Sequence, residues 1–161
     1  MIRPAEPADA KAIAALLNPW IETTAVTFNP VPKSEDDILG MIASKAAAGH
    51  AFLVAVQDGD LLGQASYGQF RGGEGYRTCM EHSITLAPQA KGRGIGRALM
   101  AAIEDHARVQ GAHQMIAAVS GENPDGRAFH ERVGYRHIAT IPEAGFKFGR
   151  HIDLVLMQKI L

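Results

Sequence analysis

The chain has 161 residues, of which 47% are hydrophobic and 20% charged, so we expect one domain over residues 1–161 with an ordinary buried core. The net charge of −1 and the absence of a basic block exclude nucleic acid as an expected partner, and no apolar run approaches the ~20 residues of a membrane span. A single cysteine excludes an intrachain disulfide framework, and the N-terminal residues lack the apolar stretch of a signal peptide. Together these features predict a cytoplasmic protein that acts on a small molecule.

Two helices are predicted in the first third of the chain. The first begins near Pro7, a good first-turn residue, and its apolar spacing is disturbed at Pro19. The second begins after Ser34, where Asp37 completes a capping-box pattern, and is expected to end near Gly49.

Strands follow. A turn signal at Asp58-Gly59 separates predicted strands over residues 51–56 and 61–67, and a glycine-rich loop comes next. Residues 78–86 alternate, which predicts a strand with two distinct faces. The faces are Met80, His82, Ile84 and Leu86 on one side, and Cys79, Glu81, Ser83 and Thr85 on the other.

The second half predicts a repeating order of strands and helices. A helix begins at Ile95 and ends at Gly111. The remaining predicted elements are a strand over 114–119, a helix over 125–132, and strands over 135–141 and 151–158. This order predicts an α/β fold of the α+β kind, with helices on both faces of a mixed central sheet.

A glycine-rich loop lies between the strand at 78–86 and the helix at Ile95. Gly92, Gly94 and Gly96 allow tight turns and a close approach to the backbone, and the first amides of a helix suit a phosphate. Arg93 and Arg97 add positive charge. The spacing fits neither a P-loop nor a Rossmann fingerprint. The sequence alone leaves two interpretations open, a pyrophosphate site and a tight strand-to-helix turn.

The stretch from Gln89 to Leu99 resembles the pyrophosphate loop of the GNAT superfamily of N-acetyltransferases. Residues 123–135, which end in His130-Glu131-Arg132-Val133-Gly134-Tyr135, resemble the second half of the same family. Several separated motifs are similar to the phosphinothricin and methionine sulfoximine N-acetyltransferases. They are Thr27-Phe28, Phe70-Arg71, Tyr76-Arg77, Glu81, the run from Gly145 to Arg150, and Asp153.

The resemblance implies a mostly antiparallel sheet that splays beside the strand at 78–86, and acetyl-CoA as cosubstrate. The implied pyrophosphate loop is Lys91, Gly92, Arg93, Gly94, Ile95, Gly96 and Arg97. Backbone amides of Ile84, Thr85 and Leu86 are expected to meet the pantetheine arm, except where they pair with the neighbouring strand. Asn123 matches a family asparagine that contacts the same arm.

Acetyl transfer requires a neutral amine, so a base must remove a proton. Glu81 matches the acidic residue that the subfamily uses, and the alternative for it is an exposed surface carboxylate. His130 falls where the family often has a tyrosine acid, so it either protonates the leaving thiolate or only packs.

Arg71 and Arg77 are candidates for binding a substrate carboxylate, because a guanidinium binds it bidentately. Phe28 and Tyr67 are expected to line the side-chain pocket. No Cys, His and Asp cluster has metal spacing, so no metal is expected.

The sequence thus predicts an acetyl-CoA-dependent N-acetyltransferase for the amine of a small amino-acid-like compound, of the phosphinothricin or methionine sulfoximine type. The resemblance also implies a homodimer. The alternatives are another amine (a polyamine, an aminoglycoside or a protein N-terminus), a non-catalytic acetyl-CoA sensor, or a structural module. A structural module leaves the glycine loop unexplained.

Overall fold

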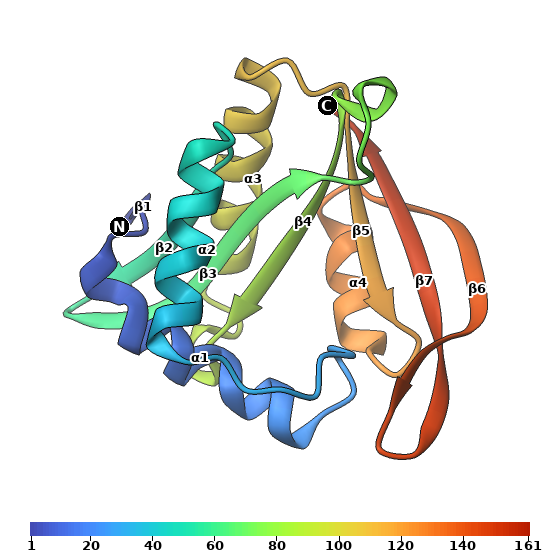
Figure 1. Ribbon diagram of the computed structural model, residues 1–161, viewed down its shortest axis with the longest axis horizontal. Helices are drawn as coiled ribbons and strands as arrows, with labels where there is room; N and C mark the ends of the chain where they lie inside the picture. Colours follow the sequence, from blue (N-terminus) through green and yellow to red (C-terminus); the bar gives the residue numbers. More distant parts are fainter.

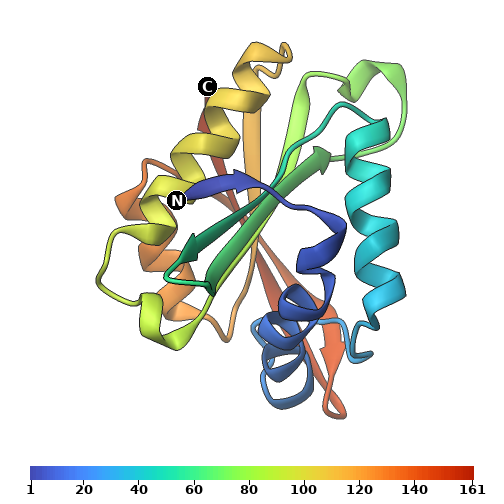
Figure 2. The same ribbon diagram turned by 90° about the vertical axis from the view of Figure 1, so that its left-hand side faces the viewer.

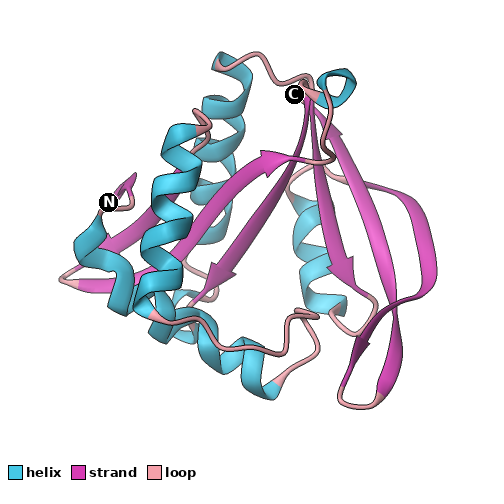
Figure 3. Cartoon of the chain, in the orientation of Figure 1, coloured by secondary structure: helices cyan, strands magenta, loops and turns pink.

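The computed structural model describes residues 1–161, which form a seven-stranded sheet of order β1-β2-β3-β4-β5-β7-β6 (Figures 1 and 3). The strands are β1 (Ile2–Pro4), β2 (Phe52–Gln57), β3 (Asp60–Gln69), β4 (Cys79–Leu86), β5 (Gln114–Ser120), β6 (Arg136–Lys147) and β7 (Arg150–Ile160). The helices are α1 (Ala10–Thr23), α2 (Glu35–Ala47), α3 (Ile95–Val109) and α4 (Pro124–Arg132). Only β4 and β5 pair in parallel; every other neighbouring pair is antiparallel.

Helices cover both faces of the sheet. Figure 2 shows α1 and α2 on one face and α3 and α4 on the other. The predicted fold class, a mixed and mostly antiparallel sheet between helices, is therefore confirmed. None of the helices has the length and apolar character needed to cross a membrane.

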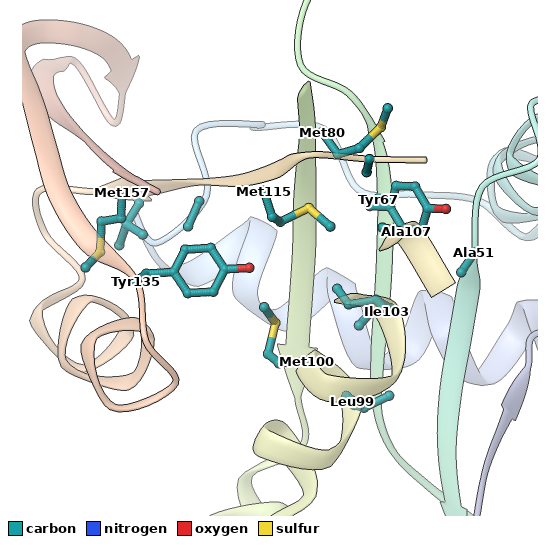
Figure 4. Close-up of a cluster of buried hydrophobic side chains, with 14 of the residues drawn as sticks. Ala51, Tyr67, Met80, Leu99, Met100, Ile103, Ala107, Met115, Tyr135 and Met157 are labelled. Carbon is teal, nitrogen blue, oxygen red and sulfur yellow. The ribbon is translucent and has the colours of Figure 1, made fainter. Parts of the chain in front are cut away.

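Each face has its own hydrophobic core. The smaller core joins α1, α2 and β2, with Ile13, Ile38 and Val54 fully buried at its centre. The larger core packs α3 against the central strands, and Figure 4 shows Leu99 and Ile103 among its members. Burial of these apolar side chains is the main stabilising term for the fold.

The capping box predicted at the start of α2 is present. Ser34 Oγ accepts a hydrogen bond from the Asp37 amide at 3.0 Å, and Asp37 Oδ2 accepts one from the Ser34 amide at 2.8 Å. Two donors that a helix N-terminus leaves without partners are satisfied in this way. The helix therefore begins at the predicted place.

Helix α1 differs from the sequence expectation, because it continues through Pro19 to Thr23. A proline inside a helix removes one backbone hydrogen bond. The turn after it is retained because Ile21 is buried, and Thr23 Oγ1 donates to the Pro19 carbonyl at 2.7 Å.

The C-terminal hairpin is also longer than predicted. Strand β6 runs past the expected end at residue 141 to Lys147, with a register irregularity between Ile141 and Gly145. Pro142 lies in that stretch, and β6 is the edge strand of the sheet. Proline is tolerated there because an edge strand leaves one row of amides unpaired. The short β1 at the opposite edge was not predicted.

The feature that positions the site is a splay between the two parallel strands. Strand β4 pairs with β3 along its length, to Leu86, but with β5 only from Cys79 to Glu81. Figure 1 shows β4 and β5 together near the C-terminus and diverging below it. The splay that the family resemblance implied is therefore present.

Candidate active site

Glu81 lies where β4 and β5 begin to separate, and its side chain faces a polar cavity. The cavity has a volume of about 280 Å³, and no hydrophobic residue lines it. Its lining residues are Lys45, Ser66, Gly68, Gln69, Glu81, His82 and Ser83. Burial raises the pKa of Glu81, and the nearby Lys45 ammonium opposes that rise. A half-buried carboxylate with a raised pKa has the properties of a general base.

The peptide groups of β4 alternate between its two neighbours. At one end of the β3–β4 ladder the Ala87 amide donates to the Leu62 carbonyl at 2.9 Å, and at the other the Phe70 amide donates to the Cys79 carbonyl at 2.9 Å. Bonded pairs recur at every second residue of an antiparallel ladder. The odd-numbered residues of β4 therefore direct their peptide groups to β3.

The peptide groups of Ile84 and Leu86 point away from β3, toward the side from which β5 has departed. They form a free strand edge that an extended ligand can pair with. Thr85, the third residue expected to meet the pantetheine arm, pairs with Gln64 on β3 instead, and its hydroxyl accepts a bond from Gln64 Nε2 at 3.2 Å. Only two of the three predicted backbone contacts are therefore available on this edge.

The glycine-rich loop ends in a left-handed turn at the start of α3. Gly92 and Gly94 both have a φ of 75°. The five amides from this loop into the first turn that have no acceptor in the chain are those of Gly92, Gly94, Ile95, Gly96 and Arg97. Unpaired amides at a helix N-terminus form an anion site.

The other loop residues divide between solvent and core. Lys91, Arg93 and Arg97 are all exposed, and Arg93 donates to Gln57 Oε1 at 2.6 Å, which holds it beside β2. Gly96 is buried, and a methyl group there would come within 2.9 Å of Leu86 and 3.0 Å of a ring carbon of Phe129. Gly96 therefore lets α3 approach the sheet closely, in addition to offering its amide.

Asn123 caps α4 at the far side of the splay. Its Oδ1 accepts a hydrogen bond from the Gly126 amide at 2.9 Å, which leaves its side-chain NH₂ free to donate. A Cβ at Gly126 would lie 2.3 Å from that nitrogen. The glycine is thus required by this orientation of Asn123.

His130 is buried on α4 and stacks on His82, with ring centroids 5.0 Å apart. Its Nδ1 lies 2.7 Å from the Gly126 carbonyl oxygen, which can only accept, so Nδ1 carries the proton. Burial lowers the pKa of His130, and the Gly126 bond opposes this shift. In the neutral ring the buried Nε2 is an acceptor, and it has no partner in the chain. Burial also lowers the pKa of His82, to about 3.

Phe28 belongs to the segment between α1 and α2, which the C-terminal hairpin holds in place. A Cβ at Gly145 would lie 2.5 Å from the Phe28 ring, so the two residues are in close contact. Buried Lys147 donates to the carbonyls of Ile21, Thr24 and Thr27 at 2.6, 2.7 and 2.8 Å. Lys147 therefore fixes this segment.

Tyr67 does not line the cavity that contains Glu81, contrary to the sequence expectation. It is 1% exposed and belongs to the larger core (Figure 4). Its hydroxyl lies 2.7 Å from His106 Nδ1 of α3. Its cross-strand partner is His82, and cross-strand partners lie on the same face. Glu81 lies on the other face.

Arg71 and Arg77 lie in the loop between β3 and β4, and neither lines that cavity. Both are exposed; Arg77 pairs with Glu74 at 3.1 Å, and Arg71 lies over the Tyr76 ring at 5.5 Å. In the single chain these arginines therefore do not contact a ligand placed beside Glu81.

Lys45 was missed by the sequence reasoning. It follows Ile38 and Ile42 at positions i+7 and i+3, on the stripe of α2 that faces the sheet. A lysine on an otherwise apolar stripe was the sequence pattern that could have indicated a functional role for Lys45. No group of three or more His, Cys, Asp or Glu side chains is placed to hold a metal ion.

Comparison with known proteins identifies the family. The sequence profile of the Acetyltransferase (GNAT) family matches residues 15–135. The chain belongs to the GNAT acetyltransferase family. It is 35% identical to the L-amino acid N-acyltransferase MnaT of Escherichia coli, over 98% of this chain and 91% of that protein. It is 34% identical to the L-methionine sulfoximine/L-methionine sulfone acetyltransferase of Salmonella typhimurium, over 98% and 92%.

Solved structures of acetyltransferases match the whole chain. The ribosomal-protein-alanine N-acetyltransferase of Brucella melitensis has a TM-score of 0.95 and 37% identity, over 100% of this chain and 99% of that one. The phosphinothricin acetyltransferase of Sinorhizobium meliloti, in complex with acetyl-CoA, has a TM-score of 0.94 and 31% identity, over 100% and 88%. This GNAT protein is an acetyl-CoA-dependent N-acetyltransferase.

The geometry of this GNAT chain fits acetyl-CoA. Unpaired amides at the start of α3 suit a pyrophosphate, and the free edge of β4 suits an extended amide-containing arm. Open space surrounds the Cβ positions of Gly92 and Gly94, so the backbone can be approached there.

Replacing Gly94 by valine is expected to weaken acetyl-CoA binding at least tenfold, because a β-branched residue at a φ of 75° is strained and its side chain obstructs the amides. Acetyl-CoA at 100 times Kd adds about 2.7 kcal/mol of stability to the wild type, measurable as a thermal shift. Gly49→Val is the matched control, since Gly49 has a φ of 72° and open space but lies at the end of α2. The loop assignment is wrong if both variants keep the full shift.

Proposed function

We propose that this enzyme acetylates the α-amine of a small amino-acid-like compound, of the phosphinothricin or methionine sulfoximine type. The observation that carries the proposal is the polar cavity in which Glu81 and Lys45 face the same space beside the splayed strands. An α-amino acid carries both charges, and the cavity offers the opposite charge for each. The names of the relatives support the same class of acceptor.

In this proposal Glu81 removes the first proton. Its carboxylate takes a proton from the substrate ammonium, directly or through a water, and so leaves the nitrogen lone pair free to attack. Acetyl-CoA supplies the activated acetyl group when it is bound. The amides of Ile84 and Leu86 face the space where an extended arm can lie, so one of them can donate to the thioester carbonyl.

His130 is assigned the second proton. The acylated nitrogen must lose one more proton, and the departing sulfur must gain one. Neutral His130 has its proton on Nδ1, so Nε2 must accept a proton before it can deliver one. We assign His130 this relay, from the nitrogen to the sulfur.

Other amines fit the cavity less well. A polyamine or an aminoglycoside carries several cations, whereas Glu81 is the one carboxylate that lines the cavity. A protein N-terminus is also an α-amine, and the Brucella melitensis structure is named a ribosomal-protein-alanine N-acetyltransferase. A peptide, however, lacks a carboxylate on the carbon that carries its amine. A sensor without activity leaves the placement of Glu81 in a polar cavity beside the splayed strands without a role.

The test is release of free thiol from acetyl-CoA with a panel of acceptors. The panel contains phosphinothricin, methionine sulfoximine, methionine sulfone, a peptide with N-terminal alanine, spermidine and an aminoglycoside. We expect turnover with the first three compounds and little with the rest. Preference for the peptide or the polycations would refute the proposed acceptor class.

We also propose a homodimer. Strand β6 forms an edge of the sheet, and apolar side chains are exposed on it and on the turn to β7: Ile138, Ile141, Phe146 and Phe148. An exposed apolar edge favours association. Sedimentation at micromolar concentration is expected to show a dimer that Phe146→Lys weakens at least tenfold. A wild type that sediments only as a monomer contradicts this assignment.

A further inference from the structure

Lys45 lines the same cavity as Glu81, but it comes from helix α2 and not from the sheet. Lys45 lies in the last turn of α2, and its Nζ lies above Gly68 of β3. A methyl group at Gly68 would be 2.8 Å from that nitrogen. Gly68 is the cross-strand partner of Glu81. The missing side chain at Gly68 is what allows the ammonium to approach the strand pair that carries the carboxylate.

The ammonium of Lys45 has no partner within the chain. Its Nζ donates no hydrogen bond, and none of the six ion pairs includes it. Burial lowers the pKa of Lys45, and the carboxylate of Glu81 in the same cavity opposes that shift. The two side chains do not form a salt bridge. A half-buried cation without a bonded anion loses hydration without compensation, so an anion that enters the cavity gains a ready partner.

The two arginines suggested by the sequence are less suited to this role. Arg77 is engaged with Glu74 and Arg71 with the face of Tyr76, and both are in the solvent-exposed loop. Lys45 is instead directed at the space that Glu81 faces. An α-amino acid has its ammonium and carboxylate on one carbon, which matches a carboxylate and an ammonium that line the same small cavity.

We propose that Lys45 is the residue that binds the carboxylate of the acceptor and so restricts the enzyme to free amino acids. This inference rests on the proposed function, because it assigns a specificity role within the same cavity. Glu81 receives the ammonium end and Lys45 the carboxylate end. A peptide N-terminus or a simple amine then leaves Lys45 unpaired, and a polyamine places a second cation near it.

The test compares methionine sulfoximine with its carboxamide, which keeps the amine and removes the negative charge. In Lys45→Met we expect KM for the acid to rise on the order of 10- to 100-fold, the usual loss for a hydrogen bond to a charged group. We expect KM for the carboxamide to change less than about twofold. The acetyl-CoA thermal shift should be unchanged, and Lys45→Arg should recover part of the acid's affinity.

Arg77→Ala is measured alongside as the competing assignment. An unchanged KM for the acid in Lys45→Met, or an equal loss for acid and carboxamide, overturns the role of Lys45. A selective loss in Arg77→Ala instead assigns the carboxylate to that arginine. If the wild type acetylates neither compound while acetyl-CoA still stabilises it, the proposed function itself fails, and this inference fails with it.

Discussion

Replacing Lys147 by methionine is expected to lower the free energy of unfolding by roughly 2–5 kcal/mol. An ammonium has three N–H donors, and Lys147 directs one to each of three carbonyls, that of Ile21 in the last turn of α1 and those of Thr24 and Thr27 in the segment that follows. Methionine keeps most of the chain length but donates nothing, so three acceptors lose their partner together. For a domain of this size the melting temperature should fall by roughly 5–15 °C.

The same variant separates a positioning role from a purely structural one. The segment fixed by Lys147 carries Phe28, which packs on Gly145 and does not line the cavity that contains Glu81. The sequence predicts that Phe28 contacts the acceptor side chain, and on that prediction release of the segment raises KM for the amine. The acetyl-CoA thermal shift should survive, since the loop that begins α3 is not involved. Lys11→Met, at an exposed position of α1, is the matched control. A variant with wild-type stability and KM contradicts the role given to Lys147.

Local patterns predicted those parts of the site that depend on one segment. Alternation in residues 78–86 placed Glu81 and His82 on opposite faces, and the structure confirms this. The glycine spacing before Ile95 predicted a loop that leaves amides unpaired. Strand alternation and glycine-rich turns are local properties, so one sequence is sufficient to find them.

Contacts between distant segments were not predictable in this way. The sequence predicts Tyr67 in the pocket, but the register between β3 and β4 pairs Tyr67 with His82, on the face opposite Glu81. That register is set across a long loop, so the strand's own pattern does not reveal it. The sequence does not single out Lys45, because its place in the cavity depends on which strand α2 covers. The bonds from Lys147 to carbonyls more than 100 residues away likewise have no signature in the sequence.

The largest expected effect on activity is that of Glu81→Gln, which should lower kcat on the order of 10²- to 10⁴-fold. Glutamine keeps the size of the side chain and removes its basicity, so acetyl-CoA binding should be retained. The variant should also be at least as stable as the wild type at neutral pH. Burial raises the pKa of folded Glu81, so the stability linked to its neutral form is present at low pH and is lost as pH rises through that raised pKa. An uncharged glutamine avoids that loss.

The pH dependence of kcat at saturating acetyl-CoA is the measurement that tests Glu81 as the base. In the wild type, the rate should rise with pH as Glu81 ionises, at a pH above the usual range for a carboxyl group because burial raises its pKa. Ionisation of the amine is coupled to the same step, so the observed limb belongs to the pair. In Glu81→Gln the rate should stay low near neutral pH and recover at higher pH, because an α-amine titrates near ~8 and then needs no base. Glu35→Gln, at an exposed position of α2, should leave the profile unchanged. If Glu81→Gln keeps a near-wild-type kcat at neutral pH, Glu81 is not the base, and the rate rests on positioning of an amine that solvent deprotonates.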